Sequence, residues 1–440
     1  MANASSILLP FVLFTAAAAE DQPALIREFK DTALIELSHD GHLILTSRLR
    51  AVKCEDGKKG CYKEVLTVYD NASGKSLGEL ISQNPSSYGT PDLFWKPEFV
   101  DQGEVRTIQS TWDKQRKSLV YAALKWNPIS GAEQRSPIDI PKDFLYQCPL
   151  DDGRLLGLGA SEIRPPYVPT DRTGQSFNMG DPANQAPRHT IRPLETMAGS
   201  SVEKIAVLTD APFPLNLNCK ASHSGRFYLI EDAQSGENQE NSPFGKSLAW
   251  FSPESIAPPR PCRTFENQRI HGYAISPDSS RVAVITSLLT DPDWRTFLTV
   301  LDGATCDEVY RFELKFPEKP RPRAPLLAPS RKYLDNVPFA GQFARSITIS
   351  PDNTLLAVAY GISKGISGSA FFGLYSLSDG HRMATLKGDT FTPNLQQIFI
   401  SDIYSAREAP LDGALQFSPD SKSLYTSSRN LRVWDVSKVR

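Results

Sequence analysis

Three ungapped segments near the C-terminus share one pattern, and this repeat constrains the fold more than any other feature. Residues 274–284, 348–358 and 416–426 each run from a β-rich stretch through Ser-Pro-Asp into a second β-rich stretch with alternating apolar side chains. Proline presets φ for a turn, and Asp and Ser side chains accept hydrogen bonds from nearby backbone N–H groups. Each segment is therefore predicted to be a β-hairpin.

Weaker copies of the same turn occur upstream. They read Ser-His-Asp-Gly at 38–41, Val-Asp-Gln-Gly at 100–103, Leu-Asp-Asp-Gly at 150–153 and Ser-His-Ser-Gly at 222–225, which makes seven turns, 50 to 73 residues apart. A second turn often follows, as at 71–74, 303 and 379–380, so each unit is predicted to hold four antiparallel strands. Such spacing indicates stacked sheets. No amphipathic helix of twelve or more residues interrupts the series, so we predict an all-β protein.

The final unit, residues 417–436, resembles a WD-repeat blade and carries the Trp434-Asp435 dipeptide at the end of its third strand. The resemblance covers 270–440 well and 30–270 only as a pattern. It implies a β-propeller closed by its termini, because the chain stops after a third strand and residues 24–29 can supply the fourth. The Gly-His pair of the family is missing, and Ser428 or Arg429 stands in place of its loop Asp.

These departures make the repeats degenerate and similar to bacterial extracytoplasmic propellers of the TolB type. We therefore expect residues 24–440 to form a single β-propeller of seven four-stranded blades, closed by N- and C-terminal strands. The second and third blades are poorly defined in the sequence, which leaves six or eight blades as alternatives.

The N-terminus has the pattern of a secretory signal peptide. Residues 7–14 are almost wholly apolar, and Ala17-Ala18-Ala19 fits an A-x-A cleavage site, so residues 1–19 would be removed. No Lys or Arg precedes the apolar stretch, which leaves an apolar tail as the alternative. No other segment approaches the roughly 18 apolar residues of a membrane span. We therefore expect a secreted or periplasmic protein with no membrane span in the mature chain.

All six cysteines follow this segment, and an even count in an exported chain favours disulfide bonds. Cys54 and Cys61 enclose six residues between two strand-like stretches, so we predict a bond between them. The other candidates, whose pairing stays open, are Cys148, Cys219, Cys262 and Cys306. Buried free thiols are the alternative. The spacing does not fit a zinc site.

The irregular sequence gathers on one face of the expected propeller. With strands named a to d from the centre outward, a–b and c–d turns share one face, and b–c and d–a connections share the other. The a–b turns are all short. Long segments fall in the b–c connections (54–61, 162–188, 234–245, 289–294 and 361–368) and in the d–a connections (82–91, 317–343 and 388–412). Loops on a rigid scaffold often carry function, so we expect this b–c/d–a face to bind.

Basic and aromatic side chains are favoured binding anchors, and the candidates here are of that kind. They are Arg188, His189, Arg192, Trp294, Arg321, Arg323, Arg331 and Tyr333. The alternative interpretation is that these are ordinary solvated loop residues.

No linear motif predicts catalysis, a metal or a cofactor. G-x-S-x-G at 361–365 would make Ser363 a nucleophile only between a strand and a helix, and a strand-like stretch follows it. Asp291 and Asp293 could hold a hard cation but fit a capped turn better. H-E-x-x-H, P-loop and G-x-G-x-x-G motifs are missing. A propeller enzyme can nevertheless assemble its site from single residues on several blades.

The charge balance, 48 Lys+Arg against 50 Asp+Glu, argues against a nucleic-acid binder, which needs a concentrated basic face. We predict a non-enzymatic, monomeric scaffold that holds a protein or peptide partner on the b–c/d–a face or at the channel mouth. The alternative is a lactonase- or lyase-like enzyme, with three or more Asp, Glu, His or Asn side chains from different blades converging at the channel mouth. A third possibility is a sensor subunit whose catalytic partner is a separate chain.

Overall fold

The structure is a computed structural model, and the part of the chain that it describes consists of strands and turns. It comprises residues 23–54, 59–83, 93–100, 103–113, 118–138, 145–149, 155–158, 191–198, 201–209, 227–231, 247–251, 260–266, 268–290, 293–315, 342–363, 368–391 and 414–439. These residues contain no helix, and hence none long and apolar enough to cross a membrane. The predicted all-β class is confirmed for them.

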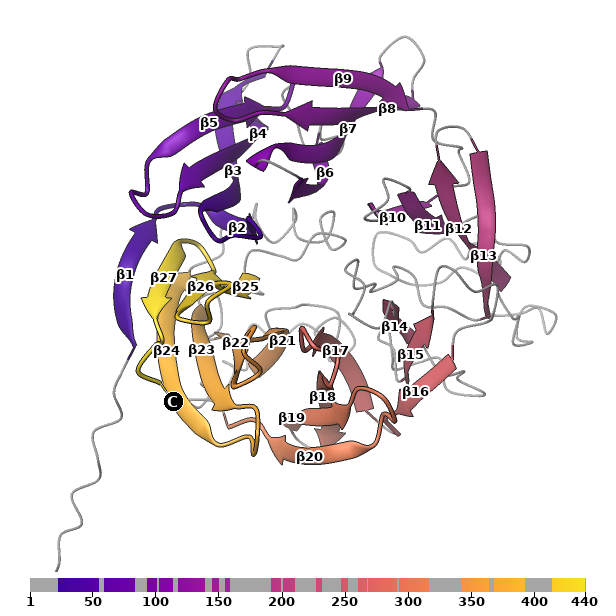
Figure 1. Ribbon diagram of the computed structural model, residues 1–440, viewed down its shortest axis with the longest axis vertical. Helices are drawn as coiled ribbons and strands as arrows, with labels where there is room; N and C mark the ends of the chain where they lie inside the picture. The colour runs from indigo at the N-terminus through magenta and orange to yellow at the C-terminus, as the bar shows by residue number, and fades with distance from the viewer. Residues whose placement is uncertain are drawn as a thin grey trace, which may run out of the picture.

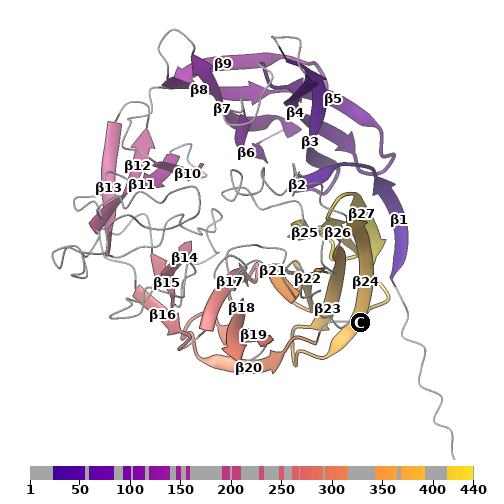
Figure 2. The same ribbon diagram turned by 180° about the vertical axis from the view of Figure 1, so that it is seen from behind.

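The strands form separate antiparallel sheets arranged in a ring, with their first strands toward the centre (Figure 1). The view from behind shows the same ring (Figure 2). The sheets, each from inner to outer strand, are β2 (Ala33–Leu37), β3 (Leu43–Lys53), β4 (Lys59–Asp70) and β5 (Ser76–Ile81); β6 (Leu93–Phe99), β7 (Val105–Asp113), β8 (Ser118–Trp126) and β9 (Glu133–Ile138); β10 (Leu145–Pro149), β11 (Leu155–Leu158), β12 (Ile191–Ala198) and β13 (Ser201–Thr209); β14 (Phe227–Glu231), β15 (Ser247–Phe251) and β16 (Arg260–Thr264); β17 (Gln268–Ile275), β18 (Arg281–Thr290), β19 (Asp293–Asp302) and β20 (Glu308–Glu313); β21 (Gln342–Ile349), β22 (Leu355–Ser363), β23 (Gly368–Ser376) and β24 (Arg382–Phe391); and β25 (Ala414–Phe417), β26 (Ser423–Ser427), β27 (Leu431–Asp435) and β1 (Ala24–Phe29).

Antiparallel sheets repeated radially around a centre make a β-propeller, the fold that the WD-like repeats predict. The last of the sheets, here called the terminal sheet, contains both ends of the described chain. Its outer strand β1 pairs antiparallel with β27, from Ala24 opposite Asp435 to Phe29 opposite Leu431. The sequence prediction that residues 24–29 add the fourth strand to this sheet is therefore confirmed.

One hydrogen-bond circuit recurs in the a–b turns. Ser350 Oγ donates to Asp352 Oδ1 (2.7 Å) and accepts from the Leu355 N–H (2.9 Å). Asp352 Oδ1 in turn accepts from the Thr354 N–H (3.2 Å). The same three bonds occur in the turns at 38–42, 276–280 and 418–422. The weak copy at 38–41 is therefore a true copy, and in all four turns the Ser hydroxyl and the Asp carboxylate bond to each other and to two backbone N–H groups.

The c–d turns share a residue with positive φ, which a side chain normally disfavours. Three of them use glycine there, namely Gly74, Gly131 and Gly380, with φ of 71 to 74°. The turn between β19 and β20 instead places Cys306 at this position, with φ of 63°. Its N–H donates to the Asp302 carbonyl (2.8 Å), as the N–H of Gly74 does to that of Asp70. A side chain has thus been accepted where glycine fits better.

Two disulfide bonds are formed by the described cysteines. The predicted bond between Cys54 and Cys61 is present and joins the residue after β3 to the third residue of β4. The second bond joins Cys306 to Cys262 of β16 and so links the c–d turn of one sheet to the outer strand of the sheet before it. Of the remaining candidates, Cys219 lies outside the described residues, and Cys148 lies in β10 with its side chain undescribed.

The hydrophobic core lies between adjacent sheets. One cluster joins the β17–β20 and β21–β24 sheets through Ile285, Leu298, Val358 and Phe371, and another joins the terminal sheet to the β2–β5 sheet through Ile44, Tyr425 and Val433. Each b strand is covered on both sides, which explains why residues 282–287 and 355–360 are buried throughout. Burial of each large apolar side chain contributes about 1.5–3 kcal/mol.

Two predicted b–c insertions are wrong. The segment 289–294 is mostly strand, because β18 and β19 stay paired to Thr290 opposite Asp293. The segment 361–368 is likewise shortened, because β22 and β23 stay paired to Ser363 opposite Gly368. Asp-Pro-Asp and the glycines look like loop sequence, but cross-strand pairing in a long hairpin outweighs these local preferences.

We expect Ser350→Ala to lower the free energy of unfolding by about 1–3 kcal/mol, because it leaves the buried Leu355 N–H without its side-chain acceptor. Ser378→Ala, in an exposed c–d turn, is the matched control and should change it by less than about 0.5 kcal/mol. Urea titrations of the two variants measure the difference. Equal effects would show that the circuit contributes nothing to stability.

The position of Cys306 allows a second test. Cys306→Gly and Cys262→Ala both remove the disulfide, but only the first relieves the positive φ. Cys306→Gly should therefore be the more stable variant, by about 1 kcal/mol. Chemical denaturation of the purified variants under oxidising conditions measures this, and a more stable Cys262→Ala would contradict the argument.

Candidate functional site

The predicted binding residues lie mostly beyond the described part of the chain. Arg188, His189, Arg321, Arg323, Arg331 and Tyr333 are outside it. Arg192 is the second residue of β12, opposite Leu208, and Trp294 is the second residue of β19, opposite Leu289; the side chains of both are undescribed. The part of the b–c/d–a face that can be described is built from other residues.

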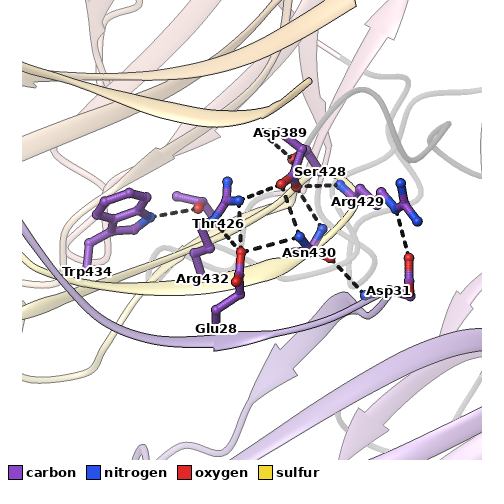
Figure 3. Close-up of polar contacts among 9 residues, drawn as sticks. All are labelled: Glu28, Asp31, Asp389, Thr426, Ser428, Arg429, Asn430, Arg432 and Trp434. Carbon is purple, nitrogen blue, oxygen red and sulfur yellow. Dashed lines mark hydrogen bonds and ion pairs between the residues drawn. The ribbon is translucent and has the colours of Figure 1, made fainter. Parts of the chain in front are cut away.

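A polar cluster around Asp389, near the end of β24, is the best-defined constellation on that face (Figure 3). Asp389 Oδ2 accepts hydrogen bonds from Ser428 Oγ (2.6 Å) and from the backbone N–H groups of Arg429 (3.1 Å) and Asn430 (2.8 Å). Its Oδ1 accepts from Asn430 Nδ2 (3.1 Å) and Arg432 Nη2 (2.6 Å). One carboxylate thus caps the whole b–c turn of the neighbouring terminal sheet.

The cluster continues to the N-terminal segment. Arg432 also forms an ion pair with Glu28 of β1 (2.8 Å). Asn430 Oδ1 accepts from the Asp31 N–H (2.9 Å), and Arg429 Nε donates to Asp31 Oδ1 (2.8 Å). Figure 3 shows these side chains converging from β24, β1 and the turn between β26 and β27. The cluster therefore joins three segments that are far apart in the sequence.

Burial separates the two ion pairs of this cluster. The side chain of Asp389 is 7% exposed and that of Arg432 16%, whereas those of Asp31 and Arg429 are 68% and 65% exposed. Burial by itself would raise the pKa of Asp389, but the hydrogen bonds from Ser428 and the Asn430 N–H, with the charge of Arg432, outweigh it and lower that pKa. The buried pair is built to stay ionised.

The WD-like features of the terminal sheet are partly retained. Trp434 Nε1 donates to Thr426 Oγ1 (2.9 Å) across β26 and β27. The loop Asp that the sequence lacks is replaced by Asp389, which reaches the same turn from the preceding sheet. Sequence comparison within the repeat could not reveal this, because the carboxylate is 39 residues upstream of Ser428.

A second cluster of cationic and aromatic side chains lies on β17, β19 and β20. The guanidinium carbons of Arg311 and Arg295 are 4.2 Å and 5.2 Å from the ring centroid of Phe297. Arg311 Nη2 donates to Gln268 Oε1 (2.9 Å), and Arg295 forms an ion pair with Glu313. Both arginines are exposed. Arg295, opposite Leu288, lies near the b–c end of the sheet, whereas Arg311, opposite Thr299, lies midway along the outer strand. The sequence pointed to Trp294 here and missed the alternating Arg295 and Phe297.

The described residues contain no cluster that would bind a metal ion and no complete catalytic motif. Within the described ranges, no group of three or more His, Cys, Asp or Glu side chains could hold a metal ion. Ser363 is the last residue of β22, and the next described segment is the strand β23, so the nucleophile motif lacks its helix. These observations do not separate a scaffold from an enzyme.

Comparisons with known proteins return propellers of diverse function. No protein-family model and no curated protein matches the chain. It is similar to a solved oligogalacturonate lyase in complex with manganese (12% identity, TM-score 0.48), covering 94% of this chain and 98% of that one. It is also similar to the propeller domain of the Trilobed protease from Pyrococcus furiosus (10% identity, TM-score 0.44), covering 92% of this chain and 94% of that one. A third similar structure is the propeller domain of Cps50 (Swd1) from Myceliophteria thermophila (8% identity, TM-score 0.33), covering 94% of this chain and 99% of that one. At such values these likenesses carry no argument about activity.

The Asp389 cluster generates a stability prediction. Asp389→Asn removes one partner of a buried ion pair and should lower the free energy of unfolding by about 3 kcal/mol. Asp31→Asn breaks the exposed pair with Arg429 and should cost less than about 1 kcal/mol. Denaturant titration of both variants at pH 7 measures this, and similar losses would contradict the assignment.

The same carboxylate predicts a pH dependence. Because folding lowers the pKa of Asp389, its contribution is present above the ordinary value of 3.8 and is lost as the pH falls below 3.8 through the folded value. The free energy of unfolding of the wild type should therefore fall more steeply as the pH drops below 3.8. In Asp389→Asn it should fall less steeply over the same pH range, as measured by denaturant titrations at a series of pH values. An unchanged profile in the variant would count against this role.

Proposed function

We propose that this protein is an exported, seven-bladed, WD-like β-propeller that holds a protein or peptide partner on its b–c/d–a face. The contrast between its two faces carries the proposal. Every connection between described a and b strands has five residues, and in four of them the Ser and Asp side chains bond within the turn. On the other face, 28 residues separate β20 from β21 and 32 separate β11 from β12. Sequence of this length on a rigid frame is suited to recognition.

Seven blades fit the sheets that can be followed. The described residues form seven sheets, of which only the β14–β16 sheet has three strands. The turn expected at 222–225 precedes β14, so a strand before it would complete that blade. The pairing of β1 with β27 supports closure of the ring by the two ends of the chain.

Export is supported by the disulfides together with the N-terminal pattern. Disulfide bonds persist in oxidising compartments, and small or irregular proteins there use them to hold segments that their cores do not. One bond joins Cys54, which follows β3, to Cys61 of β4, and the other joins two neighbouring sheets. Residues 1–19 would be the signal peptide and 24–440 the mature propeller.

The proposal can be tested with two matched pairs of charge reversals. Arg295→Glu and Arg429→Glu alter the b–c/d–a face, whereas Lys75→Glu and Lys422→Glu alter exposed turns on the opposite face. A partner is captured from the secreted and periplasmic fractions of the native cell, purified, and its dissociation constant measured with each variant. The first pair should weaken binding about tenfold or more, because exposed arginines are frequent anchors. The second should leave it within about twofold.

Equal losses in both pairs would contradict the assignment of the face. Metal analysis of the purified wild type tests the alternative of a propeller enzyme with a metal at its channel mouth. A stoichiometric bound metal would contradict the scaffold proposal and favour the enzyme alternative.

A further inference from the structure

Strands β3 and β4 continue together beyond the sheet to which they belong. Their pairing runs on to Lys53 opposite Lys59. The inner neighbour β2 stops at Ala33, opposite Ser47, and the outer neighbour β5 stops at Ile81, opposite Val65. Residues 48–53 and 59–63 therefore form a two-stranded extension, here called the β3–β4 arm, at the b–c end of the sheet.

The arm is held rigidly at its tip and at its base. The Cys54–Cys61 disulfide closes the tip, with 5.1 Å between the Cα atoms. At the base, Glu79 of β5 forms ion pairs with both Arg48 (2.5 Å) and Arg50 (2.7 Å). A rigid segment loses little conformational entropy when it binds, which favours recognition.

The edge of β3 on the β2 side is the open side of the arm. On the β4 side, the Ser82 N–H donates to the Glu64 carbonyl (2.9 Å), and Lys63 Nζ donates to the Gln83 carbonyl (2.6 Å), so the chain after β5 lies along it. Residues 48–53 have no ladder partner on their other side among the described residues. About every second residue of such an edge presents its N–H and C=O outward, ready to pair with another strand.

The charge of the arm selects the kind of strand that would add. Its described side chains include Arg48, Arg50, Lys53 and Lys63, and only Glu79 among the exposed acids pairs with any of them. Leu49, between the two arginines, is 52% exposed. An extended segment with alternating acidic and apolar residues complements this surface, because successive side chains of a strand point to opposite faces.

We propose that the open edge of β3 in this arm, on the β2 side, takes an extended acidic segment of a partner protein as an added β-strand. The inference rests on the proposed scaffold function and names its surface and partner class. The backbone ladder would supply affinity, and the basic side chains would supply the preference for acidic sequence. The arm is a departure from the repeat, since the corresponding hairpin of the terminal sheet turns within residues 428–430.

A labelled octapeptide of alternating Glu and Val is a suitable probe, with fluorescence anisotropy as the measurement. We expect the matching Lys-Val peptide to bind at least tenfold more weakly. Methylation of alternate backbone amides keeps the charge but blocks the ladder, and it should also weaken binding at least tenfold. Amide hydrogen exchange of the full-length protein should show new protection at residues 48–53 on binding.

Protein variants complete the test. Arg50→Glu with Lys53→Glu, both on β3, should weaken binding of the Glu-Val peptide about tenfold, whereas Lys75→Glu with Lys422→Glu should change it less than twofold. Cys54→Ser with Cys61→Ser should weaken it severalfold while the unfolding midpoint of the propeller stays nearly unchanged. Equal binding of the methylated peptide, or protection elsewhere, would overturn the arm proposal. The capture result for Arg295 and Arg429 would still decide the proposed function separately.

Discussion

Hydrogen bonds and ion pairs between residues nearly 400 positions apart hold the two ends of this structure together. Arg432 meets Glu28, Ser427 Oγ accepts from the Leu34 N–H, and Gln416 accepts from the Leu37 N–H. Without them β27 would be an exposed edge, and the apolar contact between the terminal sheet and the β2–β5 sheet would lose Phe29. Contacts so distant in sequence form only after a large loss of chain entropy, so the rest of the ring depends on their combined strength.

The polar character of this junction serves specificity more than stability. A buried ion pair contributes little net free energy, but it penalises any arrangement in which one partner is missing. Asp389 accepts five hydrogen bonds that only the correct turn and the correct neighbouring strand can donate. The b–c turn of the last repeat has no carboxylate of its own, and Asp389 of the preceding sheet bonds to this turn instead. The register of β1, β24 and β27 is fixed by the same group.

The sequence was informative where local chemistry decides the structure. Ser-Pro-Asp and Ser-His-Asp-Gly predicted the a–b turns, because the hydroxyl and carboxylate bond within five residues. It failed where pairing across the sheet decides: residues 289–290, 293–294, 361–363 and 368 are strand although they were expected in insertions. The role of Asp389 and the bond between Cys262 and Cys306 depend on contacts between sheets, for which a single sequence contains no signal. The candidate binding residues Trp294 and Arg192 fell on strands for the same reason as the failed insertions.

Three features that distinguish one sheet from another lie toward the b–c/d–a face, whereas the Cys262–Cys306 bond lies at a c–d turn on the other face. In four described a–b turns the Ser hydroxyl, the Asp carboxylate and two backbone N–H groups bond to one another, so these groups are not available to a partner. The b–c/d–a face presents the open edge of β3, Arg295 stacked on Phe297 and the exposed Arg429. Each arises from a local departure from the repeat: a hairpin longer than its neighbours, an arginine beside a ring, and a b–c turn bonded to a carboxylate of the preceding sheet. A repeat fold gains specific recognition only where its repeats cease to be equivalent, and these three departures share one side of the protein.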